Sequence, residues 1–349
     1  MANICHLTVL HERLTANLIK RYVWVPRSFH PTLITVDTST MIKQLLTVVL
    51  LMSATMALAQ KRTIQERLGY SKDTKLLIIH ADDIGVSHSQ NMATIYAMEK
   101  GSVNSGSIMV PCPWFAEIAA YAKSHPKTDF GLHLTLTSEW DYYKWGPVTD
   151  KSAVPGLITP RGYFNDNNES VQKNASPQEV EKELRNQIER AKQFGIDPTH
   201  FDTHMFCGVA DPRFLSIVRK LGREYKVPVL LNRESMKEWV NIDIKEHLSD
   251  DDIVANKLFM AFPADFEKGM EAFYTQVFSK LEPGLNVILL HASYDNEEAR
   301  GVMGEHSGYG AAWRQKDFNF FTSEECKKLV AGEKIKLITW REVRDKLLR

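Results

Sequence analysis

The sequence predicts an α/β protein, a distorted (β/α) barrel of the TIM type formed by a single catalytic domain. Apolar runs typical of buried strands alternate about seven times with helical patterns, the order expected of parallel strands joined by helical crossovers. The portion from Gln60 to Arg349 is large for one compact domain but ordinary for an α/β barrel. No internal repeat or low-complexity linker divides this portion further.

Each expected strand is a short run rich in aliphatic residues. The first carries four branched aliphatic residues in a row, which is typical of a strand buried on both faces. The strand-like runs are 76–80, 107–110, 130–134, 199–201, 227–231, 287–290 and 336–339.

Apolar residues spaced three and four positions apart predict helices between these runs. The third helix opens with Ser176, Pro177 and Glu179, a capping box with proline in the first turn. The expected helices are 89–100, 113–124, 177–194, 212–225, 264–281, 322–331 and 340–348.

A long irregular stretch, 138–174, follows the third strand. Its place at the carboxyl end of a strand predicts a loop over the functional site. It contains the aromatic residues Trp140, Tyr142, Tyr143 and Trp145. Their rings suit the flat faces of a sugar, and they equally suit ordinary packing of the loop on the barrel.

The amino-terminal part predicts export. Residues 41–59 combine Lys43 in a short basic start, an apolar core at 45–52 and small residues at Ala57 and Ala59. This is the pattern of a signal peptide cleaved near Ala59, which predicts a periplasmic or secreted protein. The alternative is a membrane anchor, but the apolar run is shorter than the roughly 20 residues that a span requires, so no stable membrane span is expected.

Residues 1–40 show no periodicity and precede this predicted leader. We therefore expect an untranslated or disordered extension there, and assign the barrel to residues 60–349.

The 43 basic and 43 acidic residues balance, so no electrostatic surface for binding nucleic acid is expected. Three cysteines remain after cleavage, Cys112, Cys207 and Cys326, which argues against a disulfide scaffold. A monomer and a homodimer are equally compatible with the sequence.

Two adjacent acids, Asp82 and Asp83, end the first strand-like run. Neighbouring carboxylates disfavour each other's ionisation unless a cation or a strong donor lies between them. Ligands of α/β proteins bind at the carboxyl ends of strands, so this pair indicates a metal site. The alternative interpretation is that the pair caps the following helix, for which a single acid would suffice.

Histidines stand at other strand ends. His133 and His204 follow the third and fourth runs, and together with an aspartate they form a ligand set suited to a water-activating divalent metal. Imidazole favours zinc or another transition metal, while carboxylate and water keep magnesium possible. Asp202 is expected to orient a ligand imidazole. His291 ends a further strand and is expected to exchange a proton, or else to be a fourth ligand or a structural residue.

At these residues the chain resembles the YdjC-like carbohydrate deacetylases. The resemblance spans about 75–348. It is carried by ADDIG at 81–85, Asn91, GSVNSGSIMV at 101–110, GLHLTL at 131–136, FDTH at 201–204 and His291.

The resemblance implies a distorted barrel that removes acetyl groups from N-acetylated sugars or oligosaccharides with a divalent metal ion, Mg²⁺ or Zn²⁺. It places the metal on Asp83, His133 and His204. It implies Asp82 as general base, His291 as general acid, and Arg314 as a residue that positions the catalytic groups.

The chain departs from the family pattern at two places. Phe206 stands where the family commonly has a second histidine, and Ala292 and Ser293 replace a proline-containing stretch after His291.

Two other functions are kept as alternatives. One is a different metal-dependent hydrolase on the same barrel, acting on a phosphoester or a peptide amide, and the other is a non-catalytic carbohydrate-binding protein. The scarcity of Lys and Arg in the site motifs counts against a phosphoester.

Overall fold

The computed structural model describes residues 62–304, 308–332 and 334–349. They belong to one compact unit, Arg62–Arg349. The predicted leader at 41–59 and the extension at 1–40 lie outside the described residues and stay predictions. Within the described part, no helix is long and apolar enough to cross a membrane.

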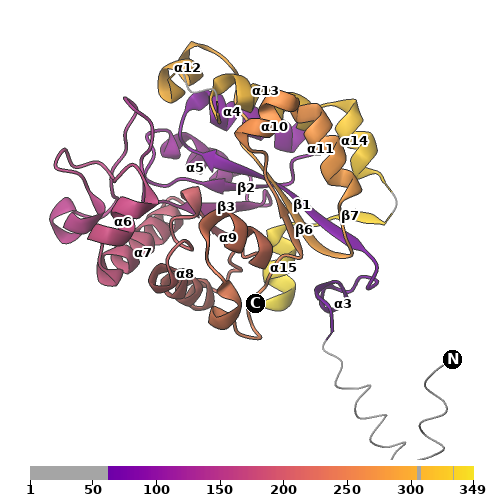
Figure 1. The fold of residues 1–349 in the computed structure, drawn as a ribbon, viewed down its shortest axis with the longest axis horizontal. Helices are drawn as coiled ribbons and strands as arrows, with labels where there is room; N and C mark the ends of the chain where they lie inside the picture. Colours follow the sequence, from indigo (N-terminus) through magenta and orange to yellow (C-terminus); the bar gives the residue numbers. More distant parts are fainter. Residues whose placement is uncertain (1–61, 305–307, 333) are drawn as a thin grey trace, which may run out of the picture. The chain divides into compact units, whose positions relative to one another are not determined.

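The unit is built on a curled sheet whose paired strands are all parallel, with helices around it (Figure 1). The strand order is β4-β3-β2-β1-β6-β5, and β7 pairs with the first residues of β1. The predicted α/β class and distorted barrel are thus confirmed. The strands are β1 (Lys75–Ile84), β2 (Ser105–Ile108), β3 (Phe130–Leu134), β4 (Phe201–Thr203), β5 (Lys257–Phe259), β6 (Gly284–Leu290) and β7 (Ile335–Leu337).

The run at 227–231 does not form the expected strand. Only Val229 makes a bridge, to Phe201 of β4. Phe201 N–H donates to the Pro228 carbonyl at 2.9 Å and Leu230 N–H donates to the Phe201 carbonyl at 2.8 Å, but the pairing extends no further. Pro228 has no N–H of its own, and Lys226, two residues before it, has a left-handed backbone with φ of 53°. The sequence also did not reveal β5. The Ala255 backbone N–H, just before β5, donates to the Leu231 carbonyl at 2.8 Å.

Helices cover the outer face of the sheet, and several differ from the predicted ones. The expected helix 264–281 is divided at Gly269, where φ is 109°. The helices are α3 (Ile64–Leu68), α4 (His88–Lys100), α5 (Phe115–Ser124), α6 (Asn168–Asn174), α7 (Pro177–Gln193), α8 (Pro212–Tyr225), α9 (Arg233–Val240), α10 (Pro263–Lys268), α11 (Met270–Ser279), α12 (Glu297–Met303), α13 (Ala311–Phe321), α14 (Glu324–Val330) and α15 (Trp340–Leu347). Short 3₁₀ turns occupy Lys151–Ala153, Pro155–Leu157, His204–Phe206 and Ile244–His247.

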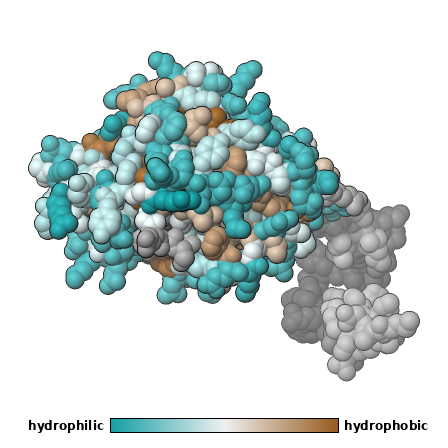
Figure 2. Space-filling model, turned by 90° about the horizontal axis from the view of Figure 1, so that it is seen from above, coloured by the Kyte–Doolittle hydropathy of each residue, from teal (hydrophilic) through white to brown (hydrophobic). Residues whose placement is uncertain are grey.

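The core lies on both sides of β1 and β6. Leu77 and Ile79 belong to a cluster shared with the outer helices, whereas Leu76 and Ile78 belong to a second cluster with Leu289 on the opposite face. Both faces are fully buried, which explains the unbroken aliphatic run in the sequence. On the face shown in Figure 2, hydrophilic residues predominate and apolar ones are scattered among them.

Asp129, just before β3, connects the last helix, α15, to the sheet through hydrogen bonds. The buried Asp129 carboxylate accepts the backbone N–H groups of Trp340 at 3.0 Å and Arg341 at 2.7 Å, in the first turn of α15. A carboxylate is favoured at this end of a helix by the free N–H groups and the dipole. Trp340 is fully buried and stacks on His200, with ring centroids 5.3 Å apart.

We expect Asp129→Ala to lower the free energy of unfolding by about 2–4 kcal/mol, because the buried Trp340 N–H and the part-buried Arg341 N–H lose a charged acceptor. Urea denaturation of this variant, with the exposed Asp166→Ala as control, measures the difference. Equal stability of Asp129→Ala and the unaltered protein would contradict this role for Asp129.

Candidate metal and active site

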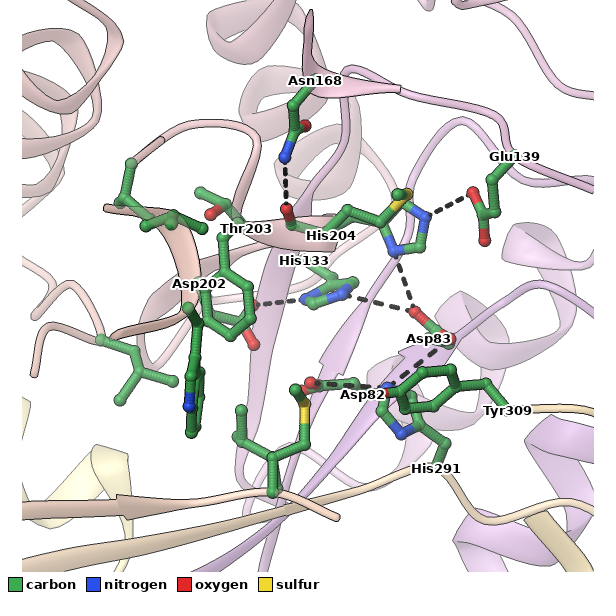
Figure 3. A pocket seen from close by; sticks show the side chains of 18 of the residues that line it. Asp82, Asp83, His133, Glu139, Asn168, Asp202, Thr203, His204, His291 and Tyr309 are labelled. Atoms are coloured by element: carbon green, nitrogen blue, oxygen red, sulfur yellow. Dashed lines mark hydrogen bonds and ion pairs between the residues drawn. The ribbon is translucent and has the colours of Figure 1, made fainter. Parts of the chain in front are cut away.

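A pocket of about 490 Å³ opens at the carboxyl ends of the strands (Figure 3). Because all the strands are parallel, their last residues meet at this one edge. The polar side chains that line the pocket are Asp82, Asp83, His133, Glu139, Asn168, Asp202, Thr203, His204, His291, Tyr309 and Arg314. The remaining lining is mostly apolar.

The end of β1 is irregular, and this irregularity brings both acids into the pocket. Consecutive side chains of a regular strand point to opposite faces of the sheet. Here the pairing of β1 with β2 shifts register between Ala81 and Ile84, and Asp83 has a left-handed backbone with φ of 62°. Asp82 and Asp83 therefore both line the same pocket.

Asp83, His133 and His204 converge on one point. The Asp83 Oδ1 atom lies 3.3 Å from His133 Nε2 and 3.1 Å from His204 Nδ1. One donor atom from each of the three buried residues lies within 4.8 Å of the other two, so together they could hold a metal ion. Those two nitrogens and the carboxylate are thus the atoms available to a shared cation.

A carboxylate lies behind each of the two imidazoles. Asp202 Oδ1 is 3.0 Å from His133 Nδ1, and Glu139 Oε2 is 2.8 Å from His204 Nε2. Such partners fix the orientation and tautomer of a ligand histidine and raise its basicity. Glu139 was not singled out in the sequence, where its only signal is its place in the loop after the third strand.

The charges of these groups reinforce one another. Burial by itself raises the pKa of Asp83, but Arg314, His133 and His204 outweigh it and hold this pKa well below its ordinary value. Burial by itself lowers the pKa of His204, but Glu139 and Asp83 raise it to about 9. The Asp83 carboxylate is therefore ionised at neutral pH.

Arg314 reaches the site from α13. Its Nη1 atom lies 2.8 Å from Asp83 Oδ2, its Nε donates to the Tyr309 carbonyl at 2.7 Å, and its guanidinium lies over the Trp140 ring at 5.6 Å. Arg314 thus contacts the carboxylate expected to bind metal and holds it in place.

His291 lies on the other side of the two acids. Its Nε2 is 3.9 Å from Asp82 Oδ2, and its backbone N–H donates to Asp317 Oδ2 at 2.9 Å. Burial lowers the pKa of His291 to about 4 despite the opposing effect of Asp83. Its imidazole is therefore neutral at pH 7 and can accept a proton. Burial also raises the pKa of Asp317 to about 7, against the hydrogen bonds from His291 and Tyr274.

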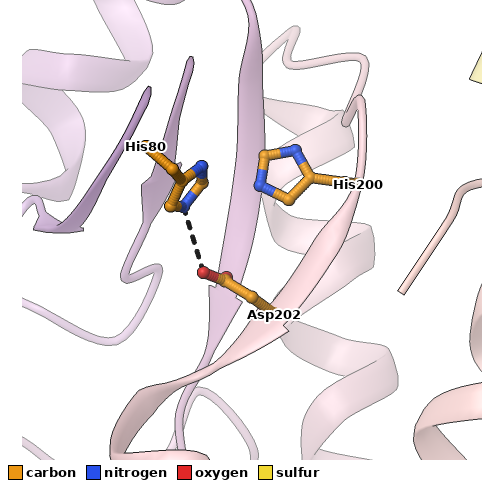
Figure 4. A group of neighbouring side chains, drawn as sticks. All are labelled: His80, His200 and Asp202. Atoms are coloured by element: carbon orange, nitrogen blue, oxygen red, sulfur yellow. Dashed lines mark hydrogen bonds and ion pairs between the residues drawn. The ribbon is translucent and has the colours of Figure 1, made fainter. Parts of the chain in front are cut away.

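A second polar layer contains His80, His200 and Asp202 (Figure 4), of which Asp202 also lines the pocket. His80 Nε2 is 2.9 Å from Asp82 Oδ1 and 3.1 Å from Asp202 Oδ2, and Ser107 Oγ donates to Asp202 Oδ2 at 2.9 Å. His200 packs edge-on to His80, in space left by Gly131, where a Cβ would lie 2.3 Å from the His200 ring. His80, His200 and Asp202 could also hold a cation, but His80 is already bound by both carboxylates.

The aromatic residues of the 138–174 loop mostly pack against the barrel. Trp145 is buried, and its indole N–H donates to the Thr137 carbonyl at 2.8 Å. Tyr143 donates to the Val86 carbonyl at 2.6 Å, and Tyr142 points to solvent. Of the four aromatic residues, Trp140 alone lines the pocket.

Comparison with known proteins places these residues in a family. The model of the YdjC-like proteins matches residues 76–332. A carbohydrate deacetylase of Brevibacillus brevis is 30% identical over 76% of this chain and 99% of its own length. A carbohydrate deacetylase of Thermus thermophilus is 27% identical over 81% of this chain and 98% of its own.

The fold has a counterpart among solved structures. A proposed cellobiose-phosphate cleavage protein of Enterococcus faecalis superimposes with a TM-score of 0.65 and 23% identity, over 78% of this chain and 99% of that one. Its likeness supports the fold alone. The family match covers most of the chain, includes every residue placed around the pocket, and shows that the chain belongs to the YdjC-like proteins.

Proposed function

We propose that this protein is a metal-dependent hydrolase that removes acetyl groups from N-acetylated sugars or oligosaccharides. The convergence of Asp83, His133 and His204 within 4.8 Å, beside Asp82 and His291, carries the proposal. The carbohydrate deacetylases among the relatives support the substrate class.

The donor set fits a divalent cation. Two imidazole nitrogens and one carboxylate suit Zn²⁺ and leave positions for water and substrate, and a carboxylate site with water also admits Mg²⁺. Asp202 and Glu139 orient the imidazoles as outer partners of metal-bound histidines do. A divalent ion held by Asp83, His133 and His204 would lower the pKa of a bound water molecule and polarise the amide carbonyl.

The proposed base, Asp82, and the proposed acid, His291, are neighbours in the pocket, with Asp82 Oδ2 3.9 Å from His291 Nε2. Asp82, held by His80, takes a proton from water as the water oxygen forms a bond to the acetyl carbon. His291 Nε2 then delivers a proton to the departing nitrogen as the C–N bond breaks, giving acetate and a free amine. Because His291 is neutral at pH 7, it must first receive the proton that it delivers from another group of the site. Asp82, which has taken a proton from water, is close enough to supply it, with Oδ2 3.9 Å from His291 Nε2. Arg314 acts as a positioning residue through Asp83.

We expect Asp83→Asn to lose bound metal and to lower kcat by about a hundredfold or more, because the cation loses its anionic ligand. Metal content of the purified protein and acetate release from N-acetylglucosamine oligomers, with and without chelator, measure the two effects. Acetate release that a chelator does not reduce would overturn the metal mechanism.

Asp82→Asn and His291→Ala are expected to lower kcat by roughly a hundredfold or more while metal content stays unchanged, since they remove proton transfer and not metal binding. The exposed His125→Ala is the control. Full activity in either variant would remove that residue from the mechanism.

Glu139→Gln is expected to weaken metal affinity about 10–100-fold, because a neutral amide supports the His204 imidazole less well than a carboxylate. Competition with a chromogenic chelator measures the affinity, with exposed Glu267→Gln as the matched control. An unchanged affinity would mean that Glu139 only packs beside His204.

A further inference from the structure

Tyr309, which lines the pocket, has a backbone conformation that a large side chain disfavours. Its φ is 60°, in the left-handed region, and it stands between Gly308 and Gly310, just before α13. A bulky residue is uncommon there because its Cβ crowds the backbone, and such residues cluster at functional sites. A glycine would adopt the same backbone without this cost. The reason for a tyrosine at this position must therefore lie in its side chain.

The ring of Tyr309 contacts two other rings. It stacks on the indole of Trp313, which is fully buried, with the centroids 4.5 Å apart and the planes 30° apart. On the His291 imidazole it packs edge to face, with the centroids 5.7 Å apart and the planes at 72°. The Tyr309 hydroxyl donates to the Ala261 carbonyl at 3.3 Å. A buried indole thus fixes the ring that lies against the imidazole.

The His291 imidazole depends on packing for its orientation. The two histidines proposed to bind metal each have a carboxylate at hydrogen-bond distance behind the ring. By contrast, Asp82 and Asp83 lie 3.9 and 4.0 Å from His291 Nε2, too far for hydrogen bonds. The bond from the His291 backbone N–H to Asp317 fixes the backbone and leaves the side-chain torsions free. The Tyr309 ring supplies a contact that restricts these torsions.

Arg314 holds the backbone of Tyr309 in place. The Tyr309 carbonyl accepts the Nε–H of Arg314 at 2.7 Å, while Nη1 of the same guanidinium lies 2.8 Å from Asp83 Oδ2. Arg314 is buried and its guanidinium is planar, so the bond at Nε and the contact at Nη1 are set together. A strained residue persists where its surroundings hold it, and this bond is one such restraint. The arginine that contacts Asp83 thereby also places the ring beside His291.

We infer that Tyr309 is a positioning residue for the proposed reaction: its ring, held by Trp313 and by the bond to Arg314, orients the His291 imidazole toward the acids. The effect on turnover rests on the proposed deacetylase function. The inference assigns no contact between Tyr309 and the substrate.

The first test separates the ring of Tyr309 from its hydroxyl and its backbone. Tyr309→Phe keeps the ring and should leave kcat for acetate release from N-acetylglucosamine oligomers nearly unchanged. Tyr309→Gly keeps the left-handed backbone and removes the ring. It should lower kcat about tenfold with KM and metal content little changed, because the imidazole loses its orientation while substrate and metal keep their contacts. The control Lys226→Gly alters another left-handed residue, exposed and outside this pocket, and should change neither constant.

A double-mutant cycle distinguishes positioning from a general structural fault. In the His291→Ala background no imidazole remains to be oriented, so Tyr309→Gly should lower kcat by less than about twofold further. A structural fault would lower kcat by the same factor in both backgrounds. Equal losses in the two backgrounds, or full kcat in Tyr309→Gly, would overturn this role of Tyr309.

Nuclear magnetic resonance separates failure of this inference from failure of the proposed function. Three-bond couplings to the ring carbon Cγ of His291 report its χ1 angle. They should show one rotamer in the unaltered protein and in Tyr309→Phe, and an average over several in Tyr309→Gly. Couplings that depend on the ring, in a protein that releases no acetate from the oligomers, would keep the positioning role and overturn the deacetylase. Acetate release together with one rotamer in all three proteins would keep the deacetylase and overturn the positioning role.

Discussion

The position of the Asp83 carboxylate is the constraint on which the rest of the site depends. Its left-handed backbone lies where the pairing of β1 shifts register, and so two consecutive acids reach one pocket. A strained residue of this kind costs on the order of 1–3 kcal/mol and persists only where its surroundings hold it. Arg314, His133 and His204 supply those contacts, each within 3.3 Å of the carboxylate. The same three contacts keep it ionised.

In the second polar layer, ion pairs hold the other buried acids of the site in the same way. His80 lies between Asp82 and Asp202, and Asp202 in turn contacts His133. Burial alone lowers the pKa of His80, but the two carboxylates raise it to about 9, so it is a cation between two anions. An unpaired charge at such depth would cost several kcal/mol. The network therefore favours one arrangement of the side chains around Asp82 and Asp202.

Sequence reasoning succeeded where burial leaves a strong local pattern. The expected strand 130–134 coincides with β3, and the aliphatic runs of β1 and β6 lie within the observed strands because both faces of these strands are buried. It failed where pairing depends on single backbone groups. The run at 227–231 makes a single bridge, at Val229, and Pro228 within it has no N–H to donate. The three-residue β5 forms from a segment with little pattern of its own.

The sequence by itself determined the parallel α/β fold and the order of acids and imidazoles at successive strand ends, since parallel strands bring those ends to one edge. Only the tertiary structure decided which histidine nitrogens face Asp83, and that Glu139 lies behind His204. The sequence had already led us to expect Asp202 behind an imidazole, and the structure shows that this imidazole is His133. The physical reason is that strand register, the curl of the sheet and the left-handed turns set these contacts. Residues so far apart in the chain carry no local signal of their pairing.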